Sequence, residues 1–313
     1  MGFVLYIGRR LLAAVPVLFG TTLIVFFMIH LVPGDPAVTL LGTHATPQAV
    51  AALHAQMGLD QPVWRQYLDF LGRLLHGDLG HSFFYQSSVT SLILGRISAT
   101  LWLILAGAIF AVLVSVPLAV WAASRRGGLA DHVIRTVPLL GLGMPAFWLG
   151  IMLILLFALK LGLFPVSGYG TTFAQHVQGI ILPGLTVALA LTPILVRSLR
   201  TSMINVLGSD YITTARAKGI GAGRTIAGHA LRNAAVSSVT VLGVNIAYLV
   251  GSTLVVERVF SLPGVGTQMI DAIFNRDFPV VQGVTMFFAV MVVAVNLLTD
   301  VAHAGLDPRV RLS

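Results

Sequence analysis

The stretch SDYITTARAKGIGAGRTIAGHALRNA, residues 209–234, is polar, basic and rich in glycine, and long apolar segments lie on both sides of it. Ser209 is placed to cap a short helix, Asp210 suits the positive end of its dipole, and Gly219 suits its C-terminal end. A second helix can restart after Gly221 or after the next glycine. The stretch therefore predicts two short helices joined by a turn, and its simplest interpretation is a connector that only sets topology.

The composition identifies an integral membrane protein. Of the 313 residues 57% are hydrophobic and only 10% are charged, and the mean hydropathy is +0.92. Soluble domains carry about a quarter charged residues. The net charge of +8 does not indicate nucleic-acid binding, because the basic residues are scattered between apolar runs and form no patch on a soluble fold. The chain has no cysteine, which excludes disulfides, thiolate metal sites and cysteine nucleophiles.

Apolar runs long enough to cross a bilayer, roughly 20 residues each, occur six times. The sequence predicts a single all-α domain, residues 1–313, that is a six-helix transmembrane bundle. The spans are expected at about 11–32, 97–123, 133–159, 177–196, 234–256 and 280–301. The first run is longer than the apolar region of a signal peptide and no cleavage site follows it, so we expect it to be retained.

Basic residues are distributed unevenly between the two predicted sides. With the N-terminus inside, thirteen of the nineteen Lys and Arg residues fall in the cytoplasm, which satisfies the positive-inside rule and places both termini there. The loop 205–233 is then cytoplasmic and the segment 33–95 is extracytoplasmic. The inside group consists of Arg9, Arg10, Arg125, Arg126, Arg135, Arg197, Arg200, Arg216, Lys218, Arg224, Arg232, Arg309 and Arg311.

Two short helices are predicted in the extracytoplasmic segment. Thr46 and the following proline suit the start of a helix over Pro47–Met57, and Gly58 suits its end. Apolar residues at helical spacing between Pro62 and His76 predict an amphipathic second helix. This helix either lies at the membrane interface or covers the bundle.

Three polar residues lie within or beside the last two spans. Asn245 falls in the fifth span and Asn296 in the sixth, and Asp300 follows one turn later on the same face. Polar groups at membrane depth are expensive and are candidates for function. Two interpretations stay open for the amides, hydrogen bonding between helices and lining of a pathway.

The sequence shows no motif for binding nucleotide phosphates or for hydrolytic catalysis. A phosphate-binding loop needs Gly-Lys-Ser/Thr, but Lys160 follows leucine and Lys218 precedes glycine. Neither HExxH nor GxSxG is present. The histidines are dispersed, and His76 and His81 are interpreted as surface residues. We therefore expect no catalytic, cofactor-binding or metal-binding residue here.

The loop 209–234 resembles the cytoplasmic EAA loop of ABC-importer permeases. Thr213, Thr214 and Ala215 occupy the first three motif positions and Gly219 the last. TARAKG and HALRNA are similar to permeases of dipeptide, oligopeptide and nickel importers. The resemblance extends along the chain through LVPGDP (31–36), GLDQP (58–62), GDLG (77–80), LPGVG (262–266) and LDPRVRL (306–312).

The resemblance implies a permease subunit, not an enzyme, in the bacterial cytoplasmic (inner) membrane. It implies four kinds of partner: a homologous second permease, P-loop ATPase subunits that hold ATP and Mg²⁺ on the cytoplasmic side, an extracytoplasmic solute-binding protein, and membrane lipid. The short helix would dock in a groove of the ATPase. The coupling residues are then Tyr211, Thr213, Thr214, Ala215, Arg216, Lys218 and Gly219.

Two other classes of protein remain as alternatives. A stand-alone secondary transporter driven by an ion gradient is the alternative, and it needs ionisable groups buried near the middle of the bilayer. A membrane-embedded enzyme is a more distant third, because the chain shows no nucleophile or metal motif. The cargo, whether dipeptide, oligopeptide or nickel, stays open.

Overall fold

Long helices dominate the computed structural model, which describes residues 3–31 and 35–306. Apolar runs of this length become helical because lipid offers no hydrogen-bond partners to the backbone. A helix forms these hydrogen bonds within itself. Among the described residues, five helices are long and apolar enough to cross a membrane. They are α1 (Phe3–Leu31), α5 (Val89–Ser124), α8 (Phe173–Leu207), α11 (Arg232–Val259) and α13 (Phe278–Leu306).

The segment predicted as the third span, 133–159, is not one continuous helix. It is divided among α6 (Leu129–Leu142), α7 (Ala146–Leu153) and a π-helical turn, η2 (Ile154–Lys160). The break falls at Pro145, which precedes α7, because proline lacks an N–H group and restricts the residue before it. The stretch from Ala146 to Lys160 forms a shorter apolar helix that accompanies the five long ones.

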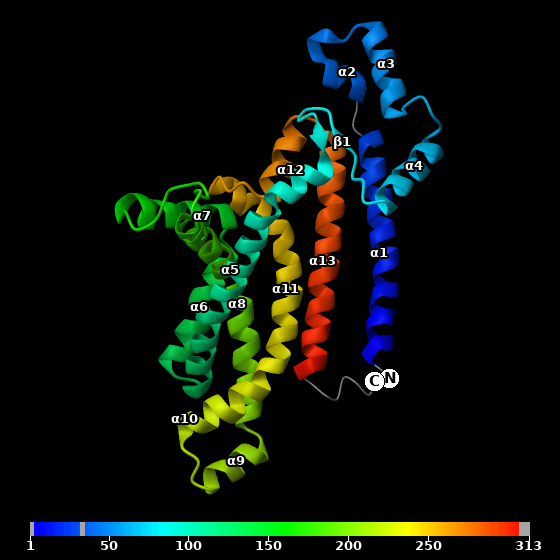
Figure 1. Ribbon diagram of the computed structural model, residues 1–313. Coiled ribbons are helices and arrows are strands. Elements are labelled where there is room, and N and C mark those ends of the chain that lie inside the picture. Colours follow the sequence, from blue (N-terminus) through cyan, green and yellow to red (C-terminus); the bar gives the residue numbers. More distant parts are fainter. Residues whose placement is uncertain (1–2, 32–34, 307–313) are drawn as a thin grey trace.

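The α5–α8 pair lies at the centre of the bundle, with α6 on one side and α11, α13 and then α1 on the other (Figure 1). Small residues allow this close packing. A Cβ atom on Gly107 of α5 would lie 2.4 Å from the Val187 side chain of α8, so no larger residue fits. Ala119 and Ala123, two small residues one helical turn apart on α5, are buried in this region and permit close approach.

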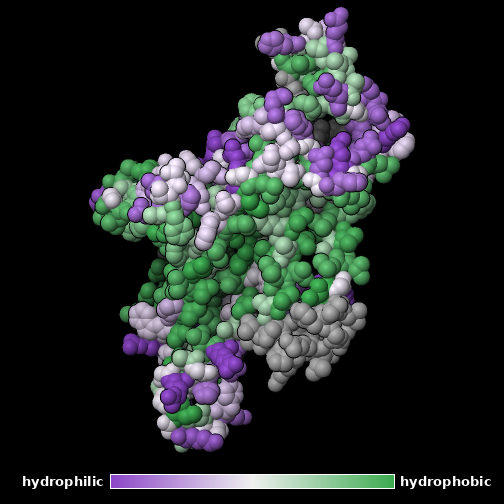
Figure 2. All heavy atoms as spheres, in the orientation of Figure 1, coloured by the Kyte–Doolittle hydropathy of each residue, from purple (hydrophilic) through white to green (hydrophobic). Residues whose placement is uncertain are grey.

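Short elements gather at the two ends of the bundle (Figure 1). One end, where α1 begins and α13 ends, carries α9 (Asp210–Ala217) and α10 (Ala222–Arg224), followed by a π-helical turn, η3 (Thr225–Leu231). The opposite end carries α2 (Pro36–Leu41), η1 (Gly42–His44), α3 (Pro47–Met57), α4 (Val63–Leu75), the hairpin of β1 (His81–Ser82) and β2 (Ser87–Ser88), and α12 (Val265–Phe274). A hydrophobic band separates two hydrophilic ends in Figure 2.

Both helices predicted within the segment 33–95 are present. α3 has the predicted bounds, since Thr46 accepts a hydrogen bond from the Ala49 N–H and Gly58 takes the left-handed conformation that ends it. α4 packs against α1 through Phe70, which is buried on Phe26. The amphipathic helix therefore covers the half of the first span that lies toward this end of the bundle.

Some predictions fall outside the described residues. These concern residues 32–34, at the end of the first predicted span and inside the LVPGDP motif, and the LDPRVRL motif beyond Leu306, with Arg309 and Arg311.

Candidate functional site

The start of α9 differs in detail from the sequence prediction. Ser209 occupies the N-cap position with extended backbone, but its hydroxyl donates to the Val206 carbonyl at 2.6 Å and does not cap α9. The hydroxyl thus adds a second hydrogen bond from Ser209 to this carbonyl at the end of α8, since the Ser209 N–H also donates to it at 3.0 Å. Asp210 lies in the first turn of α9, where its charge suits the helix dipole.

The end of α9 is a glycine-based turn, as predicted. Gly219 has φ +78°, a conformation that glycine adopts without strain. Its N–H donates to the Arg216 carbonyl at 2.9 Å, and the Ile220 N–H donates to the Ala215 carbonyl at 3.2 Å. These two bonds form a Schellman motif, which ends the helix and turns the chain back toward α10.

Two residues that the sequence analysis missed anchor α9. Ile212 is fully buried, whereas its neighbours are exposed. Asn233, at the start of α11, donates to the Tyr211 hydroxyl at 3.0 Å. The lone aliphatic residue in an otherwise polar and alanine-containing helix was a usable signal for the first contact. The second joins positions 22 residues apart and had no signal in the sequence.

The predicted coupling residues lie together on this one protruding helix and its end (Figure 1). Six of the seven are exposed and Ala215 is half-buried. The exposed six are Tyr211, Thr213, Thr214, Arg216, Lys218 and Gly219. α9 therefore presents hydroxyl groups and two cations outward while Ile212 holds it to the bundle. Such a surface is accessible to a partner protein.

The three polar residues of the last two spans do not form one cluster. Asn245 donates to the Val241 carbonyl of its own helix at 2.7 Å. Asn296 is exposed on α13. Asp300 pairs with Arg10 Nε at 3.0 Å and so joins α13 to α1. The hydrogen bond of Asn245 thus lies within its own helix, whereas the ion pair of Asp300 links two helices.

A buried carboxyl group that the sequence analysis missed lies at the C-terminal end of α11. Glu257 is fully buried, and its Oε1 accepts from the Thr100 hydroxyl of α5 at 2.7 Å. Its Oε2 accepts from the Thr267 N–H, in the first turn of α12, at 3.0 Å. The Thr100 hydroxyl in turn accepts from the Val265 N–H at 2.9 Å. Glu257 thereby ties together α5, α11 and α12.

This carboxyl group explains the LPGVG motif. α12 has Gly264 at its N-cap position and no capping side chain of its own, so Glu257 supplies the acceptor. A Cβ on Gly266 would lie 2.7 Å from the Leu254 Cα and 2.9 Å from Glu257 Oε2. The motif therefore provides the space that the carboxyl group and the α11 backbone need.

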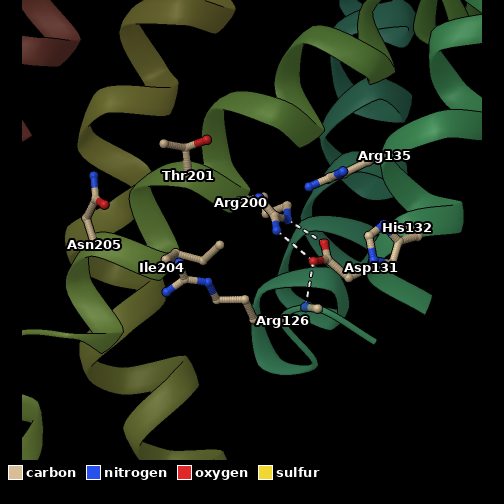
Figure 3. Close-up of a pocket in the computed structure, with 9 residues that line it drawn as sticks. Arg126, Asp131, His132, Arg135, Arg200, Thr201, Ile204 and Asn205 are labelled. Atoms are coloured by element: carbon tan, nitrogen blue, oxygen red, sulfur yellow. Dashed lines mark hydrogen bonds and ion pairs between the residues drawn. The ribbon is translucent and has the colours of Figure 1, made fainter. Parts of the chain in front are cut away.

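An ion pair between Asp131 and Arg200 lies at the α9 end of the bundle. It lines a cavity of about 350 Å³ between the α5–α6 turn and α8 (Figure 3). Arg200 of α8 forms two bonds to Asp131, from Nε at 2.5 Å and from Nη2 at 2.7 Å, and the Gly127 N–H donates to the same carboxylate. Asp131 precedes the predicted third span and is buried. The guanidinium holds the pKa of Asp131 at about 2, against the opposing effect of burial.

Comparison with known proteins identifies the family. Residues 115–312 match the binding-protein-dependent transport system inner membrane component, and residues 3–104 match the N-terminal part of the same kind of membrane component. The chain belongs to this family. It is accordingly a multi-pass protein of the cytoplasmic membrane and the membrane subunit of an ABC importer.

Relatives align over nearly the whole chain. The dipeptide transport system permease protein DppB of Escherichia coli (strain K12) is 39% identical, with 98% of each chain covered. The glutathione transport system permease protein GsiC of Salmonella typhi is 37% identical and that of Escherichia coli (strain K12) 36% identical, again with 98% of each chain covered.

Proposed function

We propose that this chain forms half of the translocation pathway of an ATP-driven importer whose cargo is a peptide or a related small substrate. Support for the cargo comes from the relatives, which are named as dipeptide and glutathione permeases and match the chain along its full length. Nickel, which the sequence resemblance also allows, finds no counterpart among these relatives.

The observation that carries the proposed coupling is the exposed α9. A short helix with outward-facing side chains, anchored beneath by Ile212, can enter a groove on a partner protein. Only two residues separate α9 from α8, and η3 connects α10 to α11. Closure of ATPase subunits around ATP and Mg²⁺ would therefore move α9 and, through these short connections, shift α8 and α11. The seven coupling residues are the proposed contact surface, and we expect ATP and Mg²⁺ to bind the partner subunits rather than this chain.

A second permease subunit is the proposed partner within the membrane. Asn296 is exposed on α13, and Leu298 is exposed on the same helix. Tyr248 is exposed on the neighbouring α11. An amide facing lipid is unfavourable, whereas a subunit interface or an aqueous pathway can satisfy it. This argument favours a partner or a pathway along α11 and α13.

The outer end suits delivery of substrate by a solute-binding protein. A cavity of about 470 Å³ lies there between α3, α4, the β-hairpin and α13. Both acidic and basic residues line it, including Asp69, Arg73 and Asp78. Peptides carry charges of both signs, so this lining fits the proposed cargo.

The gradient-driven alternative is less well supported. Such a transporter needs a buried ionisable group that can exchange a proton or ion. Glu257 is buried in a span, but both of its carboxyl oxygens accept hydrogen bonds from the protein and it lies at the outer corner with α12. Its contacts fit a structural role.

Reconstitution tests the proposal. The chain should be placed in proteoliposomes with a homologous permease, ATPase subunits and a binding protein. We expect uptake of a radiolabelled dipeptide to require ATP and every subunit. Uptake driven by a proton or sodium gradient through this subunit alone would overturn the proposal in favour of the secondary transporter.

The proposed orientation has its own test, which exploits the absence of cysteine. Single cysteines introduced at Gly223, in α10, and at Gly168, at the opposite end, should react with impermeant reagents from the cytoplasm and from outside respectively. Labelling of the Gly223 position from outside would contradict the docking of α9 to a cytoplasmic ATPase.

A further inference from the structure

The cavity shown in Figure 3 lies beside the α9 end but shares no residue with the proposed coupling surface. Its walls come from the α5–α6 turn, the first turns of α6 and the last turns of α8. Arg126 and Arg135 reach toward α8, with the Asp131–Arg200 pair between them. Nothing in the coupling mechanism uses this cavity.

The cavity carries an excess of positive charge. Among the residues that line it, three are arginines and one is an acid. Asp131 compensates Arg200 through two hydrogen bonds. Arg126 and Arg135 are both exposed, and no second acid lines the cavity to balance them. Two positive charges therefore remain for an anion.

The donor geometry favours a phosphate group. Guanidinium groups present forked N–H donors that match phosphate oxygens, and here two of them face one hollow. Asn205 of α8 adds a neutral amide at the same wall. A volume of about 350 Å³ accommodates a phosphodiester together with small polar substituents.

Apolar residues continue both walls away from the coupling end. Leu139 follows Arg135 by one helical turn on α6 and is 47% exposed. Ile194 precedes Thr201 by two turns on α8 and is 37% exposed. Residues at these spacings lie on the same side of a helix. A ligand with its phosphate in the cavity would therefore meet apolar surface along the spans, as a lipid requires.

We propose that this cavity binds the phosphate of an anionic phospholipid, with the acyl chains lying along α6 and α8. Basic pockets between membrane helices on the cytoplasmic side recognise such headgroups. Free phosphate offers the same charge but gains nothing from Leu139 and Ile194, so the lipid is the favoured source. The bound headgroup would join α6 to the last turns of α8, directly before α9.

Native mass spectrometry of the purified full-length chain tests the site. The probe is an equimolar mixture of phosphatidylglycerol and phosphatidylcholine with identical acyl chains. We expect the wild type to retain phosphatidylglycerol preferentially, and Arg126→Gln/Arg135→Gln to lose at least tenfold in that preference, because each basic residue near a membrane surface contributes to anionic lipid binding. The single variants should each lose part of it and serve if the double variant fails to fold.

Arg125→Gln is the matched control, because it removes the same charge from the same turn but does not line the cavity. It should behave as the wild type. Equal preference in the double variant and the wild type would overturn the proposal. A second arm adds inorganic phosphate. Displacement of bound lipid by phosphate as effectively as by added phosphatidylglycerol would assign the cavity to the soluble ion and overturn the lipid source.

Discussion

Two short helices, α9 and α12, flank α11 at opposite ends of the bundle, and the chain builds them by opposite means. α9 ends through backbone hydrogen bonds around Gly219 and leaves its polar side chains exposed. α12 begins on a carboxyl group from another helix, Glu257, with close packing of Gly266 beneath it. Each device fits a different task.

The first arrangement leaves the side chains of a helix exposed, whereas the second fixes a helix to its neighbours. A helix that ends through its own backbone hydrogen bonds keeps its side chains available to a partner, as the proposed docking of α9 requires. A helix closed by a distant, fully buried side chain is fixed to the elements that supply the contact, here α5 and α11. We infer that force applied at α9 reaches the spans, whereas the α12 corner stays rigid.

The largest expected effect concerns the buried hydrogen bonds of Glu257. Glu257→Leu leaves the Thr267 N–H and the Thr100 hydroxyl without their buried acceptor, which should destabilise the fold by about 3 kcal/mol or more. Glu257→Gln retains one acceptor and should lose about half as much. Thermal unfolding of the detergent-solubilised chain measures both. An unchanged midpoint for Glu257→Leu would show that Glu257 does not stabilise the junction of α5, α11 and α12.

A smaller effect is expected at Gly266. Alanine there places a Cβ against the Leu254 backbone, and overpacking of this kind costs about 1–3 kcal/mol. Gly251→Ala is the matched control, because no atom lies within 4 Å of the added Cβ and alanine favours a helix. The same unfolding assay should rank Gly266→Ala below the wild type and Gly251→Ala at or above it. The reverse order would contradict the described packing.

The smallest effect appears only in acid. The pKa of Asp131 is lowered to about 2 by Arg200, so the stability that this pair contributes is fully present above pH ~3.8 and is lost as pH falls toward 2. The wild type should therefore lose more stability between pH 4 and pH 2 than Asp131→Asn. Parallel pH profiles for the two proteins would contradict the ion pair.

The same contrast explains which features were predictable. The bounds of α3 and the turn at Gly219 follow from local signals, namely Thr46 with Pro47, Gly58 and the glycine itself. The spans follow from apolar length, because the bilayer sets it. The break before α7 was only partly predictable, since prolines indicate kinks but do not distinguish a kink from a full interruption.

The remaining features depend on contacts distant in sequence. Thr100 and Glu257 are 157 residues apart, and Asp131 and Arg200 are 69 apart. No local pattern pairs such positions, so Glu257 was missed at the edge of the fifth predicted span, although its place before LPGVG was visible. The functional roles of the coupling residues, Asn245 and Asn296 stay predictions.

The central claim is that α9 transmits the action of the ATPase, and a pair of substitutions at Gly219 tests it most directly. Valine disfavours the left-handed conformation by roughly 1–2 kcal/mol, whereas asparagine tolerates it better. No atom lies within 4 Å of an added Cβ, so the bundle should stay intact. In the reconstituted complex we expect Gly219→Val to assemble but lose transport and substrate-stimulated ATP hydrolysis, and Gly219→Asn to retain more of both. Equal, near-wild-type activity of the two variants would contradict the claim and leave the loop as a plain connector.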